Sequence, residues 1–310
     1  MNLKILLTGK NGQIGYELSR LLPQLGEVLA VDLDELDLLK TEDIRRAIRD
    51  IRPNLIVNAA AYTAVDQAEK ERAVARALNA TAPAVMAEEA KKIGAALVHY
   101  STDYVYDGTK NTPYDERDST NPLSIYGKTK LEGDQAIQNS GVPHLIFRTA
   151  WVYGTRGKNF LLTILRLATE REELRVVKDQ TGAPTWSREI ALATTRILQE
   201  LSEPQNLVSS ISNLSGIYHL TAGGQTTWFR FAEAILEQAA QATEKAPWFV
   251  AATTSRPIVT KWIIPITTEE YPTPARRPLY SVLSNSRCEQ TFGFASPDWL
   301  TQVRSAMIQS

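Results

Sequence analysis

Lys4-Ile5-Leu6-Leu7-Thr8-Gly9-Lys10-Asn11-Gly12-Gln13-Ile14-Gly15 begins as an apolar run and ends in a turn with three glycines at a spacing of three. Gly9 permits a tight turn, Gly12 lets a phosphate approach the backbone, and Gly15 lets the next helix pack near the strand. Free N–H groups at the start of that helix favour a pyrophosphate. The stretch predicts a strand, a phosphate-binding turn and a helix; an ordinary glycine turn is the alternative.

Strand-like and helix-like segments alternate beyond this turn. Apolar runs occupy residues 4–7, 28–31, 55–58, 96–100 and 144–148, and helical patterns occupy 14–22, 41–49, 72–93 and 124–138. This alternation predicts an α/β class fold, a Rossmann-type doubly wound parallel sheet with ligands at the carboxyl ends of its strands.

The pattern changes after Tyr153. Helices are expected at 160–170, 187–201 and 228–241, a strand at 174–177, and irregular chain over the Pro- and Thr-rich 247–277. We expect residues 1–153 with roughly 187–201 to form a dinucleotide-binding domain. Residues 154–186 and 202–310 would form a smaller, partly interleaved substrate-binding cap.

Composition excludes several classes of partner. The 310 residues carry 34 Lys+Arg against 35 Asp+Glu, a net charge of −1, which offers no field to hold nucleic acid or an anionic membrane. Cys288 is the sole cysteine, which rules out an internal disulfide and a thiolate-rich metal site. The N-terminus lacks the apolar stretch of a signal peptide or membrane span, so a cytoplasmic location is expected.

The second apolar run ends in Asp32, whose carboxylate suits the hydroxyls of an adenosine ribose. It would repel a 2′-phosphate and so favours NADH. Asp37 and Leu38 follow where an adenine edge would lie. No arginine directly follows Gly15 to bind a 2′-phosphate, so the choice between NADPH and NADH stays open.

Tyr126 and Lys130 are four residues apart, which places both on one face of a helix. A nearby ammonium favours the phenolate and would make the tyrosine a better proton shuttle near neutrality. Thr102 and Asp103 end the fourth strand, where Thr102 could donate a hydrogen bond to a substrate carbonyl. Asp103 could hydrogen-bond a sugar or tune the proton equilibrium. The alternatives are a surface lysine beside a buried tyrosine, and a strand-to-turn cap.

With these residues in order, the chain resembles the extended short-chain dehydrogenase/reductase superfamily. The closer resemblance is to its dTDP-4-dehydrorhamnose reductase family. The segments that carry it are Asn58-Ala-Ala-Ala-Tyr-Thr-Ala-Val-Asp66, His99-Tyr-Ser-Thr-Asp-Tyr-Val-Tyr106, Tyr126-Gly-Lys-Thr-Lys130, Phe147-Arg-Thr-Ala-Trp-Val-Tyr153, Asp179-Gln-Thr-Gly-Ala-Pro-Thr185 and Tyr271-Pro-Thr-Pro-Ala-Arg-Arg-Pro278. They span nearly the whole chain, and the last two are specific to the family.

The resemblance implies reduction of the C4 ketone of dTDP-4-dehydro-β-L-rhamnose by hydride from the nicotinamide, the last step of dTDP-L-rhamnose synthesis. Tyr126 would donate the proton, Lys130 would bind the nicotinamide ribose and lower the Tyr126 pKa, and Thr102 would bind the reacting oxygen. The remaining implied cofactor contacts are Gly12, Gln13 and Ile14 at the phosphates and Ala61, Tyr62 and Thr63 along the cofactor. Thr102, Asp103 and Trp151 would contact the sugar nucleotide.

Further residues suit a dTDP-sugar. Trp151 follows a strand end, and its flat face suits a deoxyhexose or a base, with core filling as the alternative. Arg276 and Arg277 lie in a Pro-stiffened segment; we expect one of them, Arg276 by preference, to hold the diphosphate rather than form a solvated basic turn. Asn159 opens a helix of the cap and is expected to touch the sugar nucleotide.

One departure from the family concerns metal. Members that dimerise through a metal bridge use three glutamates, of which Glu17 matches the first. Arg188 stands at the second position, with Glu189 one residue late. A cation there opposes Mg²⁺, so we expect no metal, and either a monomer or a homodimer.

The same fold and motifs allow two functions other than a reductase. A related dehydratase or epimerase is one; dehydratase relatives place Asp-Glu after the strand-four threonine, whereas Tyr104 follows Asp103 here. The other is a non-catalytic regulatory subunit of the same fold. An intact Tyr126, Lys130 and Thr102 argues against a purely structural role.

Overall fold

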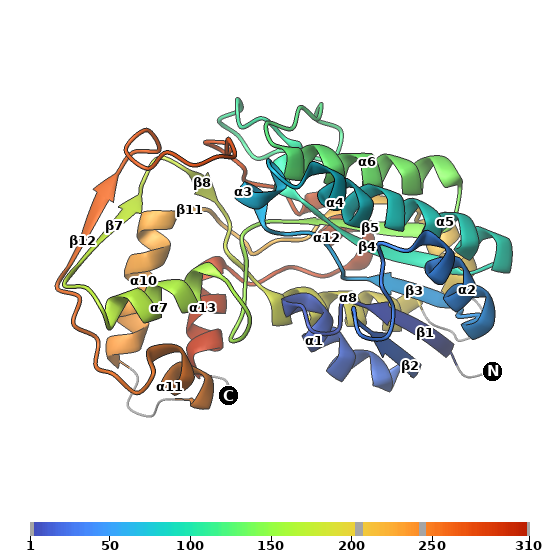
Figure 1. Ribbon diagram of the computed structural model, residues 1–310, viewed down its shortest axis with the longest axis horizontal. Helices are drawn as coiled ribbons and strands as arrows, with labels where there is room; N and C mark the ends of the chain where they lie inside the picture. Colours follow the sequence, from blue (N-terminus) through green and yellow to red (C-terminus); the bar gives the residue numbers. More distant parts are fainter. Residues whose placement is uncertain (1–2, 202–206, 242–245, 309–310) are drawn as a thin grey trace.

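The computed structural model describes residues 3–201, 207–241 and 246–308, which form a six-stranded parallel sheet with a smaller lobe beside it (Figure 1). The strands lie in the order β10-β5-β4-β3-β1-β2. Their bounds are β1 Leu3–Thr8, β2 Gly26–Val31, β3 Leu55–Asn58, β4 Ala96–Thr102, β5 His144–Thr149 and β10 Gly216–His219. The predicted doubly wound α/β fold is confirmed.

Alternate residues of the strands pack into two separate hydrophobic cores, one on each face of the sheet. On β1, Leu7 packs in one core and Leu6 in the other, because successive side chains point to opposite faces. Helices cover both faces, as a fully buried parallel sheet requires. Those of the first face are α1 (Gln13–Leu21) and α8 (Ser187–Leu201); those of the second are α2 (Thr41–Ile51), α5 (Ala82–Ile93) and α6 (Ile125–Ser140).

The strand order reverses between β1 and β3. From β1 the chain moves outward to β2, then returns to β3 on the other side of β1. The loops after β1 and β3 therefore diverge at the carboxyl ends of the strands, where doubly wound sheets bind ligands. The glycine turn lies at this switch point.

The smaller lobe has its own apolar core, around Leu161, Trp186, Phe231 and Val303. Its elements and those that connect it are β6 Val152–Tyr153, α7 Phe160–Ala168, β7 Glu173–Val177, β8 Thr181–Gly182, β9 Thr185–Trp186, β11 Thr226–Thr227, α10 Trp228–Gln241, α11 Pro247–Thr253, β12 Trp262–Ile266 and α13 Trp299–Ile308. The remaining short elements are η1 Leu22–Gln24, α3 Val65–Ala68, α4 Arg72–Arg76, η2 Ala77–Thr81, η3 Asp103–Val105, α9 Leu207–Asn213 and α12 Ser286–Phe292.

Two secondary-structure predictions need correction. The segment 247–277 is not wholly irregular, since it contains α11 and the strand β12, which pairs with β7. Pro247 starts α11, where its missing N–H costs nothing, and Pro265 lies in a two-stranded sheet, where each strand is an edge. The single helix predicted over 72–93 contains the π-helical turn η2 between α4 and α5.

The predicted domain division stays a prediction, and its boundary after residue 201 falls on 202–206, outside the described residues. Several segments assigned to the cap pack against the sheet. β10 forms its edge beside β5, and Ile211 of α9 and Phe292 of α12 belong to the first sheet core. We propose that these segments belong with the dinucleotide-binding domain. In the described part of the chain, no helix has both the length and the apolar character to cross a bilayer.

Candidate active site

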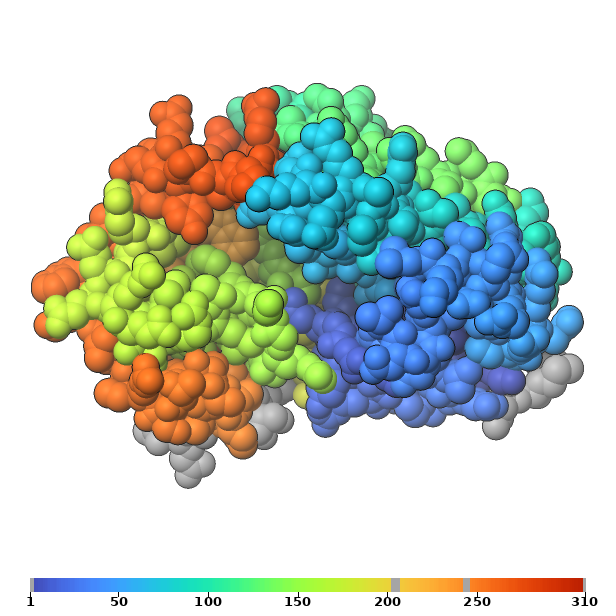
Figure 2. All heavy atoms as spheres, viewed as in Figure 1, coloured from blue at the N-terminus to red at the C-terminus, as the bar shows by residue number. Residues whose placement is uncertain are grey.

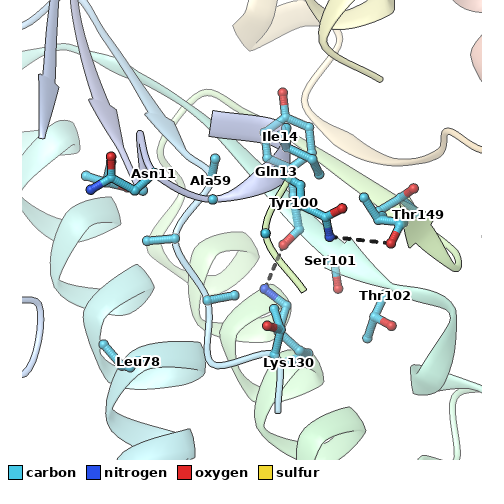
Figure 3. A pocket seen from close by; sticks show the side chains of 18 of the residues that line it. Asn11, Gln13, Ile14, Ala59, Leu78, Tyr100, Ser101, Thr102, Lys130 and Thr149 are labelled. Carbon is cyan, nitrogen blue, oxygen red and sulfur yellow. Dashed lines mark hydrogen bonds between the residues drawn. The ribbon is translucent and has the colours of Figure 1, made fainter. Parts of the chain in front are cut away.

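A cleft of about 790 Å³ lies at the carboxyl ends of the strands. Its walls come from the β1–α1 turn, the ends of β2, β3 and β4, helix α6, and two tryptophans where the lobes meet. Figure 2 shows the surface hollowed between the sheet-bearing part and the smaller lobe. Figure 3 shows side chains that converge on it from the glycine turn, β4 and α6.

The glycine turn is held by backbone contacts that leave no room for side chains. Gly9 has a φ of +78°, and a Cβ there would lie 2.7 Å from the Ala60 nitrogen. A Cβ at Gly15 would overlap the Gly9 carbonyl. Gly12 is the N-cap of α1 and supplies no side chain to its first N–H groups. These donors can therefore take an anion. Gly9, Gly12, Gln13 and Ile14 line the cleft, whereas Gly15 packs inside the turn.

The far end of the cleft is lined as the sequence predicts by Asp32, Asp37 and Leu38. The Asp32 carboxylate accepts the Asn11 N–H at 2.9 Å and the Leu33 N–H at 2.8 Å, so it also ties the glycine turn to the end of β2. Three further leucines line this end although no role was predicted for them. They are Leu33, Leu36 and Leu39.

Of the residues expected along the cofactor, Ala61 and Thr63 line the cleft. Tyr62 is turned to other partners: its hydroxyl donates to Glu71 at 2.6 Å and its N–H to Asn79 Oδ1 at 2.8 Å. Asn79 lies in the π-helical turn η2, so that irregular turn fixes the loop after β3. The contacts with Asn79 and Glu71 that position the loop could not be predicted from the loop's own sequence.

Thr102, Tyr126 and Lys130 meet in the cleft as predicted. The Ser124 hydroxyl caps α6 by accepting the Gly127 N–H at 3.2 Å, which sets Tyr126 in the first turn of the helix and Lys130 one turn later. Burial raises the pKa of Tyr126 to about 12, and a hydrogen bond with the Thr102 hydroxyl offsets part of that rise.

The Lys130 amine has a different environment from the one predicted. The side chain is 1% exposed, and Nζ donates to the Tyr100 carbonyl at 2.6 Å and lies 3.1 Å from His99 Nε2 (Figure 3 marks the first contact). Burial lowers the pKa of Lys130 to about 8. In this arrangement burial sets the direction of the Tyr126 pKa shift, and a lowering of that pKa by Lys130 stays a prediction.

Asp103 also lines the cleft and is 2% exposed. Its Oδ1 accepts the Thr102 hydroxyl at 3.0 Å, and its Oδ2 has no hydrogen-bond partner among the described residues. Burial raises the pKa of Asp103 to about 7, with part of the rise offset by the hydroxyls of Ser281 and Thr102. A carboxyl group near its pKa with one free oxygen can either donate to or accept from a ligand hydroxyl.

Trp151 adopts a backbone conformation that is rare for a bulky residue, with φ of +47°. Its indole stacks on Trp228 with ring centroids 3.5 Å apart and planes 4° from parallel, and both rings line the cleft. Gly182 leaves room for this ring, because a Cβ there would lie 2.6 Å from Trp151 Nε1. The two rings thus give the cleft a flat aromatic wall, and a substrate role for Trp151 stays a prediction. Trp228 was missed, since nothing local in the sequence pairs it with Trp151.

Asn159 and Arg276 do not reach the cleft as contact residues. Asn159 caps α7 by accepting the Leu162 N–H at 3.1 Å, and its amide donates to Gln13 Oε1 at 2.9 Å, so it positions a cleft residue. Arg276 is exposed in the loop before Pro278. Arg277 is bound to Asp66, with contacts of 2.7 and 3.0 Å. A substrate role for Asn159 and Arg276 stays a prediction.

Glu17, Arg188 and Glu189, the residues at the positions of a metal bridge, do not line the cleft. Arg188 extends over the Trp186 ring at 6.0 Å, and burial raises the pKa of Glu189. Within the described residues, no group of three or more His, Cys, Asp or Glu side chains forms a metal-binding cluster. Monomer or homodimer stays open.

Comparisons with known proteins identify the family of the chain. The family model described as RmlD substrate binding domain matches residues 3–310. A dTDP-4-dehydrorhamnose reductase from Burkholderia thailandensis is 48% identical over 96% of this chain and 95% of its own length.

Two crystal structures agree. The dTDP-4-dehydrorhamnose reductase of Clostridium acetobutylicum is 36% identical with a TM-score of 0.85, and covers 98% of both chains. That of Bacillus anthracis, solved in complex with NADP, is 32% identical with a TM-score of 0.86 over 100% of both. The resemblance drawn from the sequence motifs is confirmed: the chain belongs to the RmlD family of dTDP-4-dehydrorhamnose reductases.

Proposed function

We propose that this chain reduces the C4 ketone of dTDP-4-dehydro-β-L-rhamnose to dTDP-L-rhamnose with a hydride from NADPH or NADH. One observation carries the proposal: Thr102, Tyr126 and Lys130 share one cleft with the glycine turn. Membership of the reductase family supports the same reaction.

The hydrogen-bond donors and acceptors that line the cleft fit a dinucleotide. Gly12 and the first N–H groups of α1 would hold the pyrophosphate, and Asp32 would accept hydrogen bonds from the adenosine ribose. The leucines at the far end would enclose the adenine, and Lys130 would hold the nicotinamide ribose. When bound, the reduced nicotinamide supplies the hydride for the ketone carbon.

The chain's own residues handle the oxygen and its proton. The Tyr126 hydroxyl, and the Thr102 hydroxyl once it turns from Asp103, would donate hydrogen bonds to the carbonyl oxygen, where negative charge develops during reduction. A raised Tyr126 pKa keeps the phenol protonated at neutral pH, and an alkoxide is a stronger base even than that phenolate. Tyr126 would therefore give its proton to the alkoxide, and Lys130, which lines the same cleft, would help to restore that proton.

Trp151 and Asp103 would orient the sugar. The Trp151–Trp228 stack presents a flat apolar surface that suits the deoxyhexose or the base. The free Oδ2 of Asp103 would pair with a sugar hydroxyl. The cytoplasmic location, the lack of a nucleic-acid or membrane partner and the oligomeric state stay predictions.

The test is a reduction assay with purified protein, dTDP-4-dehydrorhamnose and each nicotinamide cofactor in turn. We expect oxidation of the cofactor with formation of dTDP-L-rhamnose. Lys130→Met should lower turnover and weaken cofactor binding, whereas Lys128→Met, an exposed lysine on the same helix, should change neither. Cofactor oxidation without a rhamnose product, or no oxidation at all, would contradict the proposal.

A further inference from the structure

Three polar side chains lie side by side at the inner wall of the cleft, one on each of three neighbouring strands. Thr8 of β1 is in register with Asn58 of β3, and Asn58 with His99 of β4. All three are at most 1% exposed, and the row ends at Lys130, which projects from α6. The contacts are Thr8 Oγ1 to Asn58 Oδ1 at 2.7 Å, Asn58 Nδ2 to His99 Nδ1 at 3.1 Å, and His99 Nε2 to Lys130 Nζ at 3.1 Å.

A backbone group fixes which atoms of this row donate hydrogen bonds and which accept them. The Ala60 N–H lies 3.2 Å from the Asn58 side chain, and because a backbone N–H can only donate, the atom facing it is Oδ1. The Asn58 amide nitrogen therefore faces His99 Nδ1, which must accept. A neutral imidazole carries one proton, so that of His99 sits on Nε2 and points at Lys130 Nζ.

This tautomer distinguishes the two charge states of Lys130. An ammonium has only donors and would meet the Nε2–H group with another N–H group. An amine has a lone pair that accepts from Nε2–H while Nζ still donates to the Tyr100 carbonyl at 2.6 Å. The His99 ring is fully buried, and burial together with the Lys130 charge lowers the pKa of His99 well below its usual value, so the ring stays neutral.

Other charged groups near Lys130 are accounted for. Asp134, one turn further along α6, favours the ammonium. Its Oδ2 accepts from Arg148 of β5 at 3.2 Å and from the Ser101 hydroxyl at 2.9 Å, while its Oδ1 has no hydrogen-bond partner among the described residues. Tyr126 lies on the cleft side of α6 and Asp103 after β4. His99 is thus the polar group whose contact with Nζ opposes Asp134.

We propose that His99, oriented through Asn58 by the Ala60 N–H, is a positioning residue that stabilises the amine form of Lys130, whose lone pair then accepts from His99 Nε2–H. The inference deepens the proposed role of Lys130 in the cleft and rests on it.

The test measures the protonation of Lys130 directly, by following its ¹⁵Nζ chemical shift against pH in the full chain without substrate. His99→Leu removes the donor, and we expect the Lys130 pKa to rise by about one unit, the size of one hydrogen bond. His99→Gln keeps the direction, since its oxygen can accept from Asn58 and its amide can donate to Nζ, so its pKa should match the wild type. An unchanged pKa in His99→Leu, or an equal rise in both variants, would overturn the proposal.

A second measurement needs no stable variant at the buried position. The ring ¹⁵N shifts of His99 in the wild-type protein report its tautomer, and the chain has only three histidines to assign. A proton on Nε2 supports the inference, and a proton on Nδ1 overturns it. Neither experiment uses the sugar nucleotide, so a failed reduction assay and a failed His99 result are independent.

Discussion

Gly182→Ala is expected to displace the aromatic surface of the cleft without touching the catalytic residues. An alanine Cβ would lie 2.6 Å from Trp151 Nε1 and 2.7 Å from Trp151 Cζ2. Because non-bonded heavy atoms settle at about 3.5 Å, the indole must retreat by roughly 1 Å. Trp228 is stacked on that indole at 3.5 Å, so the pair must move together or separate. Overpacking of this kind costs about 1–3 kcal/mol.

The expected result is a 10- to 100-fold fall in kcat/KM for the sugar nucleotide, since a shift of about 1 Å in a positioning group can cost about 100-fold. The Kd for NADPH should stay within about twofold, because the glycine turn is untouched. Steady-state kinetics, fluorescence titration and urea unfolding measure the three quantities. Gly223→Ala is the matched control, since its Cβ would meet Ser296 O at 3.2 Å, a milder approach. If Gly182→Ala matches Gly223→Ala in both kcat/KM and stability, Trp151 is not held as described.

Three further outcomes follow from single carboxylates. Asp32→Ala should raise the Kd for NADH by about tenfold or more and that for NADPH less, because Asp32 would bind the ribose hydroxyls; equal changes in fluorescence titration would exclude that contact. Asp103 has a pKa raised to about 7 by burial, and only its protonated form can donate to a ligand oxygen, so kcat/KM should fall as the pH rises through 7. Asp103→Asn keeps a donor at every pH and should flatten that part of the profile. Hydrogen bonds from Arg49, Lys92 and Arg45 lower the pKa of Glu89 from 4.5 to about 2. The stability that Glu89 contributes is thus present above pH 4.5 and lost as the pH falls towards 2. Glu89→Gln should lower the free energy of unfolding by about 1.5–3 kcal/mol at neutral pH and remove its pH dependence between 4.5 and 2, as measured by urea unfolding. If the variant keeps the wild-type loss of stability in acid, the contacts of Glu89 do not form.

Sequence periodicity predicted the elements that are buried on both faces or amphipathic. The glycine turn and the Tyr126–Lys130 spacing placed the cleft, because both are local patterns with a mechanical cause. β10 was missed because Gly216-Ile217-Tyr218-His219 is too short to show a period, and only its partner β5 makes it a strand.

Local sequence patterns could not predict which groups surround each site residue. Trp228 joins Trp151 across the two lobes, and Asn159 proved to hold Gln13, contacts that depend on tertiary packing. The direction of the Tyr126 pKa shift was predicted from one neighbour, whereas burial decides it. His99 carried a usable signal: with Thr8 and Asn58 it ends a row of polar residues at the same level of three adjacent strands.

The central claim is that the Tyr126 phenol supplies the proton for ketone reduction. The most direct measurement is turnover of Tyr126→Phe with dTDP-4-dehydrorhamnose and NADPH, alongside the Kd for NADPH. Removal of a general acid should lower kcat by at least about 100-fold, while cofactor binding survives because the ring and its packing remain. Turnover like that of the wild type would contradict the account.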